Sequence, residues 1–309
     1  MKLSTIQKSL DSFFFKPQPV HSVVLLRIAL GVIVIIGWFG MWQNLHTLWG
    51  VDGIVSLSTA LKYSAPYRFN LFAILPEQAW VPEILAILLL LAAVSMTVGL
   101  FTRASVALTF IILFSFHNRN TYVLNSADIV LRNFLFLMFF APCGDMFSMD
   151  RWLAVRRGTA GPGIPERSPW ALRLMQIQFS VIYISTVLFK MKGQEWADGT
   201  AVYFATRLDE FLRVPVSLLN NYLVLKFLTW STLVVEFMLG TLVWVKELRY
   251  WVLLAGVGLH LGIEVTMSIP LFEWIMIATM LVMVDSRDLE LLLIRLKNSQ
   301  KKYLKASIA

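Results

Sequence analysis

The stretch VVLLRIALGVIVIIGWFGMWQNLHTL, residues 23–48, decides the fold, because its only charged side chain is that of Arg27. A helix needs about 20 mostly apolar residues to cross the hydrocarbon core of a bilayer. Seven further segments share this character, two of them short: 82–100, 104–117, 128–147, 170–189, 223–245, 250–268 and 271–285. The sequence therefore predicts an all-α, multi-pass transmembrane helical bundle of about eight helices. Seven are predicted if Pro270 kinks one long segment instead of separating the last two.

The composition also indicates a membrane protein. Of the 309 residues, 58% are hydrophobic and 15% are charged, whereas soluble domains carry about 25% charged residues. The formal net charge of +8 is a property of many nucleic-acid-binding proteins as well. In this chain it is better explained by cytoplasmic loops that lie beside anionic lipid. We therefore expect membrane lipids, and not nucleic acid, as partners.

The distribution of basic residues predicts the orientation. With the N-terminus inside, the cytoplasmic segments hold 16 Lys or Arg residues and the outer segments, of similar total length, hold seven. Basic residues are enriched in cytoplasmic loops, so we expect both termini in the cytoplasm and a multi-pass protein of the cell membrane. The expected organisation is a cytoplasmic N-terminal segment 1–22, one transmembrane domain 23–285 and a basic amphipathic tail 286–309.

Several ionisable residues fall inside the apolar segments, where each costs free energy unless it is paired or serves a function. They are Arg27, Asp128, Arg132, Glu236, His260, Glu264 and Glu273. Asp128 and Arg132 are four residues apart, as are His260 and Glu264, so each pair shares a helix face. Under the expected topology most of these groups lie on the extracytoplasmic side, near Asn118, Asn120, Lys190 and Lys192.

A polar cavity open to the extracytoplasmic side explains this common depth. A purely structural role for these polar residues is the alternative to such a cavity. Asp128 and Arg132 can form a packing pair, Arg27 can pair with Glu236 or extend toward the interface, and lysines at a helix end are common interfacial anchors. The four histidines lie in separate segments without an H-E-x-x-H pair, so we expect no metal site.

Three stretches together resemble the HTTM family, the membrane domain shared with vitamin K-dependent gamma-carboxylase. They are HNRNTYVLNSADIVLRNFLFLMFFAPCGDMFSMDRWL (117–153), LFKMKGQEWADGTAVYFA (188–205) and LHLGIEVTMSIPLFEWIMIA (259–278). The second is the most specific, because it resembles the family pattern Lys-Leu-x-Gly-x-x-Trp-x-Asp-Gly-Thr-Ala. The resemblance extends over residues 20–285.

The resemblance implies a catalytic lysine that faces the outside of the cell. In the carboxylase, a lysine ahead of the tryptophan deprotonates reduced vitamin K. By position this role falls on Lys190 or Lys192, with His260 as the next catalytic candidate. A reduced quinone such as vitamin K hydroquinone is the implied cofactor, and its expected binding residues are Asn118, Asn120, Asp128, Arg132, Trp196 and Glu264.

The chain also departs from the carboxylase, which carries large lumenal domains after its membrane helices. A stand-alone bacterial branch of the family, similar to sporulation-delaying protein B, fits the length of 309 residues better. The expected function is therefore that of a bacterial inner-membrane protein that modifies or matures a secreted peptide, or acts on a quinone-like lipid, by lysine base chemistry. A carboxylase-like enzyme is one form of this. The alternatives are a non-enzymatic maturation or export partner that binds a peptide and, last, a small-molecule permease.

Overall fold

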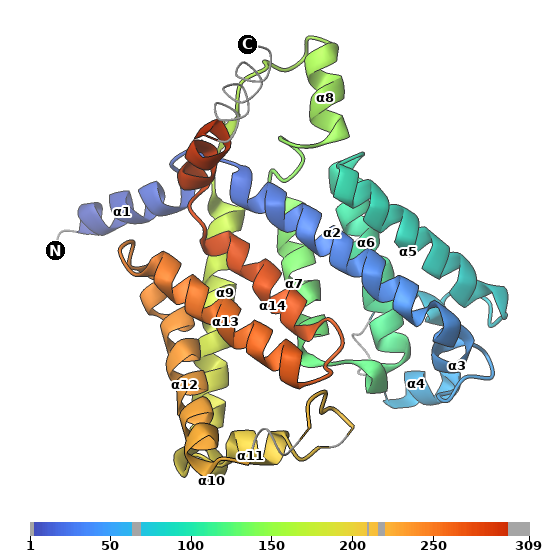
Figure 1. The fold of residues 1–309 in the computed structure, drawn as a ribbon. Coiled ribbons are helices and arrows are strands. Elements are labelled where there is room, and N and C mark those ends of the chain that lie inside the picture. Colours follow the sequence, from blue (N-terminus) through green and yellow to red (C-terminus); the bar gives the residue numbers. More distant parts are fainter. Residues whose placement is uncertain (1–2, 64–68, 209, 216–219, 296–309) are drawn as a thin grey trace, which may run out of the picture. The chain divides into compact units, whose positions relative to one another are not determined.

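The computed structural model describes residues 3–63, 69–208, 210–215 and 220–295, and most of these residues are helical, with almost no strand (Figure 1). They divide into two compact units. Unit 1 comprises Met1–Arg173 and Val284–Ala309, and unit 2 comprises Leu174–Met283. The predicted transmembrane domain 23–285 thus contains one complete unit and most of the other.

Unit 1 is built around three long antiparallel neighbours, α2 (His21–Met41), α5 (Trp80–Val98) and α6 (Thr102–Arg119), which pack in that order. Helix α7 (Ser126–Phe140) packs against α6. The short elements of the unit are α1 (Leu3–Phe15), β1 (Gln18–Pro19), η1 (Trp42–Asn44), α3 (Leu45–Trp49), α4 (Leu57–Tyr63), η2 (Leu71–Ala73), η3 (Thr121–Val123), α8 (Met149–Arg156) and β2 (Glu166–Arg167). Residues 286–295 are also helical. The rest of the predicted basic tail, 296–309, lies outside the described residues.

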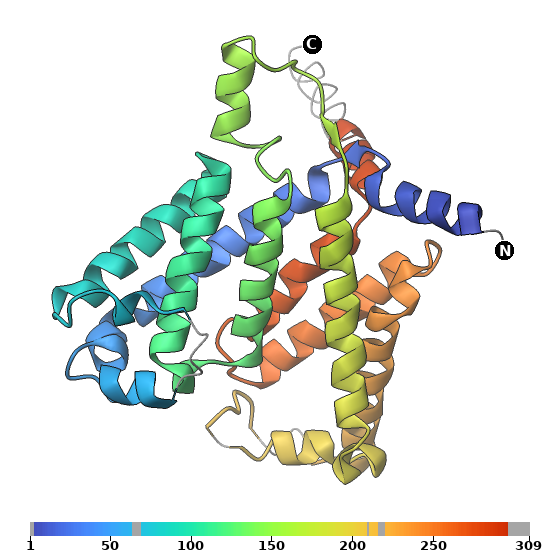
Figure 2. The same cartoon turned by 180° about the vertical axis from the view of Figure 1, so that it is seen from behind.

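Unit 2 contains most of α9 (Trp170–Lys190) and the helices that follow it (Figure 2). Two short helices come directly after α9, and α12 then packs against α13, which packs against α14. The elements are α10 (Gln194–Ala197), α11 (Ala201–Ala205), α12 (Tyr222–Gly240), η5 (Leu242–Trp244), α13 (Arg249–Thr266), α14 (Phe272–Thr279) and η6 (Met280–Met283). Gly240 lets α12 approach α9 closely, because a Cβ there would lie 2.7 Å from the Ile184 side chain.

Four helical stretches of the described chain are long and apolar enough to cross a membrane: His21–Trp49, Trp80–Val98, Trp170–Lys190 and Tyr222–Gly240. Each of the other four predicted segments also contains a helix, but that helix is shorter or more polar. Helices α13 and α14 are separate, with Pro270 and the left-handed Leu271 between them. The break at Pro270 therefore divides this segment into two helices.

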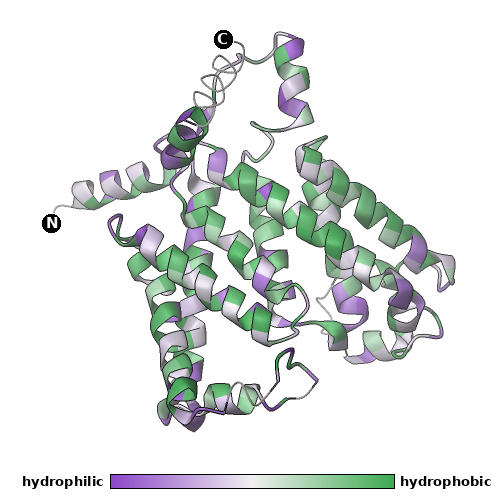
Figure 3. Ribbon diagram, viewed as in Figure 1, coloured by the Kyte–Doolittle hydropathy of each residue, from purple (hydrophilic) through white to green (hydrophobic). Residues whose placement is uncertain are grey.

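The surface of these helices explains the apolar composition. Figure 3 shows hydrophobic residues along most of α2 and α5. Large apolar side chains point outward from them, including Phe39, which is 67% exposed, and Leu91, which is 61% exposed. Such a surface is costly in water and is the ordinary surface of a helix in lipid.

Arg27 shows how a buried charge is accommodated inside unit 1. Its side chain is fully buried in α2, and its guanidinium donates hydrogen bonds to the carbonyl oxygens of Met96, Thr97 and Phe147 at 2.7, 3.2 and 2.6 Å. Two of these carbonyls lie in the last turn of α5, where helical carbonyls lack partners of their own. Arg27 therefore stabilises the end of α5, and its partners are backbone atoms and not Glu236.

Candidate functional site

Lys190 is the last residue of α9 and contacts two side chains of unit 2. Its Nζ donates a hydrogen bond to Oε1 of Glu236 on α12, at 2.5 Å. The same Nζ lies 4.6 Å from the centre of the Trp196 ring. The Lys190 side chain is 22% exposed and that of Glu236 is 8% exposed. The result is an ion pair in which the carboxylate is buried and the amine is partly exposed.

The turn after α9 places Lys190 and Trp196 together. The backbone N–H of Gly193 donates to the carbonyl of Lys190 at 2.9 Å, which reverses the chain before α10 begins. A Cβ at Gly193 would lie 3.2 Å from Cδ1 of Trp196, so the indole folds closely against this turn. Lys192 lies on the other side of the turn, where it is exposed and its Nζ is 5.1 Å from the Phe189 ring. The two lysines of the motif therefore have different surroundings.

A second group of polar side chains is buried in unit 2. His260 on α13 lies between Tyr183 on α9 and Glu273 on α14, and the three residues are 3%, 2% and 1% exposed. Its Nδ1 is hydrogen-bonded to Oε2 of Glu273, and its Nε2 is 2.8 Å from Oη of Tyr183. An ionised carboxylate can only accept. With Glu273 ionised, Nδ1 therefore carries a proton, and with the imidazole neutral the Tyr183 hydroxyl donates to Nε2.

The two groups share helix α9. Tyr183 and Lys190 are seven residues apart and therefore lie on the same face of that helix. One oxygen of each carboxylate, Oε2 of Glu236 and Oε1 of Glu273, is buried without a hydrogen-bond partner among the described residues. We call the five residues Lys190, Glu236, Tyr183, His260 and Glu273 the unit 2 polar cluster. All five can gain or lose a proton.

Glu264 lies outside this cluster. Its Oε1 accepts a hydrogen bond from Arg213 at 2.8 Å, and the same guanidinium nitrogen donates to the Glu264 carbonyl at 2.9 Å. A bridge between Leu212 and Met267 holds the two segments together. The carboxylate that contacts His260 is therefore Glu273 on the next helix, and the expected pairing of His260 with Glu264 is wrong. Glu264 instead fastens the segment around Arg213 to the end of α13.

In unit 1, Asn118, Arg119 and Asn120 are buried and donate to backbone carbonyls of the loop that precedes α5. Asn118 donates to Phe69 at 2.8 Å and Asn120 to Leu48 at 2.9 Å. Arg119 donates to Val55 and Gly50 at 2.7 and 3.0 Å. The structure thus gives Asn118 and Asn120 a loop-holding role.

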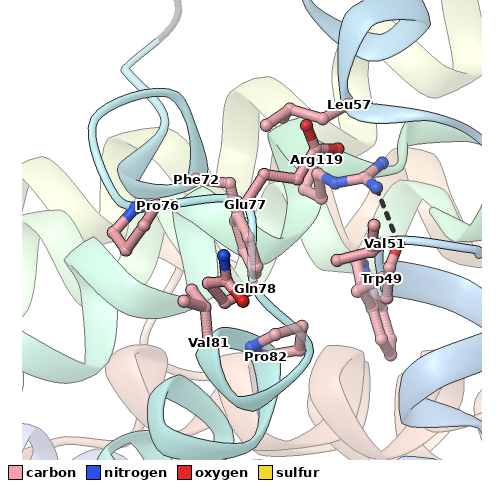
Figure 4. Close-up of a pocket in the computed structure, with 11 residues that line it drawn as sticks. Trp49, Val51, Leu57, Phe72, Pro76, Glu77, Gln78, Val81, Pro82 and Arg119 are labelled. Atoms are coloured by element: carbon pink, nitrogen blue, oxygen red, sulfur yellow. Dashed lines mark hydrogen bonds between the residues drawn. The ribbon is translucent and has the colours of Figure 1, made fainter.

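The cavity beside Arg119 is small. Figure 4 shows the Arg119 guanidinium near Glu77 and Trp49, at the edge of a cavity of about 20 Å³. That volume accommodates about one water molecule. Asn118 and Arg119 line a second cavity, of about 50 Å³. Asn120 lines neither cavity, and a quinone-binding role for Asn118 and Asn120 stays a prediction.

Asp128 serves first as a helix cap. Together with Asn125 it forms a capping box at the start of α7, in which Oδ2 of Asp128 accepts from the Asn125 N–H at 2.9 Å. Its other oxygen is 3.8 Å from Nε2 of His117, and Asp128 also experiences the charge of Arg132. The Arg132 guanidinium lies over the Phe114 ring at 5.1 Å. His117 is a neighbour of Asp128 that the sequence motifs did not single out.

Sequence reasoning also missed Tyr183. A signal for it exists, because Tyr183 and Lys190 are seven residues apart and therefore lie on the same face of α9. Glu236 and Glu273 were recognised as intramembrane carboxylates but without their partners, which come from other helices. Among the residues that the structure describes, no group of three or more His, Cys, Asp or Glu side chains is arranged to bind a metal.

Comparison with known proteins identifies the family of this chain. The model of the HTTM domain matches residues 15–287, which is most of the chain. No curated protein and no solved structure matches the chain. The match includes every member of the unit 2 polar cluster and all four apolar stretches that are long enough to span a bilayer. The chain therefore belongs to the HTTM domain family, a membrane family related to the gamma-carboxylase.

Proposed function

We propose that this protein is a membrane enzyme in which Lys190 removes a proton from the hydroxyl of a quinone-like lipid at the extracytoplasmic surface. The observation that carries the proposal is the position of the Lys190 amine, between the Glu236 carboxylate and the Trp196 ring. Lys190 and Trp196 both belong to the motif 188–205 that resembles the carboxylase. The family membership makes the same chemistry a reasonable expectation for this chain.

The Lys190–Glu236 pair contains what a base needs. When the proton shared in the hydrogen bond passes from Nζ to Oε1, Lys190 becomes a neutral amine and Glu236 a neutral acid. The amine lone pair then takes the proton of a substrate hydroxyl, and the electron pair of the broken O–H bond stays on the substrate oxygen. The resulting ammonium lies beside that anion and stabilises it.

The site fits a flat aromatic alcohol. A reduced quinone supplies a hydroxyl that ionises more readily than an aliphatic alcohol. Trp196 offers an aromatic ring beside the amine. Tyr183, His260 and Glu273 act as positioning residues, because they are buried and hydrogen-bonded to one another across α9, α13 and α14.

The location follows from the topology predicted from the basic residues. With both termini inside, α9 begins at the cytoplasmic surface and ends outside, so Lys190 lies at the extracytoplasmic end of a helix that is apolar enough to span the bilayer. We propose in addition that the protein crosses the membrane several times and that the product of this step serves the modification of a secreted peptide.

The test uses vitamin K hydroquinone as the probe under anaerobic conditions, where it cannot be oxidised. The ultraviolet spectrum of the hydroquinone distinguishes the neutral molecule from its anion. Protein in nanodiscs should raise the anion fraction, Lys190→Arg should abolish this effect, and Lys192→Arg should retain it. Arginine keeps the positive charge but does not release its proton near neutral pH.

Three outcomes would contradict the proposal. An anion fraction in Lys190→Arg that equals that of the wild-type protein would show that Lys190 is not the base. It would favour a binding role for the unit 2 polar cluster. No spectral change with the wild-type protein would exclude a quinol of this type as the substrate. A loss in Lys192→Arg alone would assign the base to Lys192 instead.

A further inference from the structure

Helix α1 carries an apolar stripe that the rest of the described protein does not cover. At 100° per residue, Ile6, Leu10, Phe13 and Phe14 fall within an arc of about 100°. The remaining circumference holds the polar residues Gln7, Lys8, Ser9, Asp11 and Ser12, and Phe15 at the last position of the helix. An apolar arc of this width is typical of a helix that buries one face.

The exposure of the stripe changes along the helix. Phe13 and Phe14 are partly buried, whereas Ile6 is 38% exposed and Leu10 is 53% exposed. Every described side chain from Thr5 to Ser12 is exposed. The last turn of α1 is therefore attached to the protein, and the preceding turns present their apolar side chains to something else.

The attachment places the end of α1 beside the beginning of two helices that can span the bilayer. Arg173, in the first turn of α9, donates from Nε to the carbonyl of Phe13 at 3.0 Å, and its guanidinium lies over the Phe13 ring. The strand β1 that follows α1 pairs with β2, which lies just before α9. Helix α2 begins at His21, directly after β1. Because spanning helices begin at the membrane surface, this end of α1 lies at that surface.

The direction of α1 agrees with this position. In Figures 1 and 2, α1 runs across the direction of α6 and α7, and α2 and α5 run obliquely to it. A helix that starts at the membrane surface and runs across the bundle remains near the plane of that surface. Its apolar arc is then wide enough to enter the boundary between headgroups and acyl chains.

We propose that α1 is an interfacial helix that lies on the cytoplasmic leaflet, with Ile6 and Leu10 directed into the acyl chains. The apolar stripe of α1 is covered by the phospholipid bilayer in which the protein is embedded. Lys8 on the opposite face and Lys16 just after the helix are exposed and complement anionic headgroups. The inference depends on the membrane location of the chain and is independent of any catalytic role of Lys190.

The experiment compares two positions that point in nearly opposite directions, Leu10 and Ser12. Each residue is replaced in turn by cysteine in the full-length protein, and the cysteine is labelled with a nitroxide spin label. The labelled protein is reconstituted into vesicles of phosphatidylcholine and phosphatidylglycerol. Both native side chains are exposed, so neither replacement disturbs a packed contact. The natural thiol of Cys143 is 1% exposed and should remain unlabelled.

Collision with oxygen, which dissolves in lipid, and with a water-soluble nickel complex then reports the surroundings of each label. We expect the label at Leu10 to collide mainly with oxygen and the label at Ser12 mainly with nickel. Equal access of nickel to both labels would show that α1 extends into water. Protection of the Leu10 label from both reagents would show that protein, such as a second copy of the chain, covers the stripe. Either of these two results overturns the proposal.

Discussion

Separating the structural from the chemical role of Lys190 requires a double-mutant cycle with Glu236. In Lys190→Met the Glu236 carboxylate, 8% exposed, loses its cation. Leaving one member of a buried ion pair alone costs about 3–5 kcal/mol. Because Lys190 is 22% exposed and water can reach the site, we expect the low end of that range, about 3 kcal/mol. Contact with the Trp196 ring adds about 0.5–1 kcal/mol.

The double variant Lys190→Met/Glu236→Leu should recover most of this loss. Replacing both members of a buried pair by apolar side chains is close to neutral or even stabilising. The expected coupling free energy is thus about 2–3 kcal/mol, measured as the difference between the double variant and the sum of the single ones. The double variant should nevertheless remain inactive toward the hydroquinone, because it contains no base.

The assay is unfolding of the purified protein by SDS in mixed micelles, followed by circular dichroism. Arg213 and Glu264 form the matched control, since their side chains are 40% and 16% exposed. We expect that more exposed pair to couple by about 1 kcal/mol or less. Additive effects of Lys190→Met and Glu236→Leu would refute the reasoning, because they would show that the two groups do not stabilise each other in the membrane.

Three further predictions concern the rest of the chain. Gly99→Ala should lower the SDS concentration at the unfolding midpoint, because Gly99 has φ of 71° and a Cβ there would collide with packed side chains. Gly161→Ala should leave the midpoint unchanged, since a Cβ at that position meets open space. A membrane-impermeant thiol reagent added outside the cell should label a cysteine at Thr200 and not one at Gly161, and the reverse pattern would invert the predicted topology. Asp128→Ala should destabilise the protein by about 1 kcal/mol even in an Arg132→Ala background, because the cap that Asp128 provides to α7 does not depend on Arg132. Complete rescue by the second substitution would show that charge pairing alone explains Asp128.

The helices could be predicted from the sequence because apolar length determines them. Each of the eight predicted segments overlaps one of the helices described above, and the boundaries differ where local chemistry decides. Helix α7 ends at Phe140 although its predicted segment continues to residue 147. Pro142 explains the difference, since proline disfavours helical backbone in the residue before it and donates no N–H. The division of the apolar segments into two units could not be predicted, because hydropathy carries no information about which helices pack together.

The partners of the ionisable groups were harder to predict than their positions. Spacing rules describe contacts along one helix, and they indicated Glu264 as the partner of His260. In the structure the carboxylate comes from α14, thirteen residues away in sequence, after the turn at Pro270. Lys190 and Glu236 likewise come from different helices. Contacts of this kind depend on how helices pack, which the spacing of residues within one segment does not specify.

The buried arginines of unit 1 and the unit 2 polar cluster differ in the kind of partner that they contact. Arg27 and Arg119 in unit 1 donate to backbone carbonyls, and a carbonyl of this kind does not take up a proton under ordinary conditions. These arginines stabilise a helix end and a loop. In unit 2, Lys190 and His260 are bonded to the side chains of Glu236 and Glu273, which accept and release protons. Proton transfer therefore has a chemical basis in unit 2 that the arginine contacts of unit 1 lack, and the base is best sought at the end of α9.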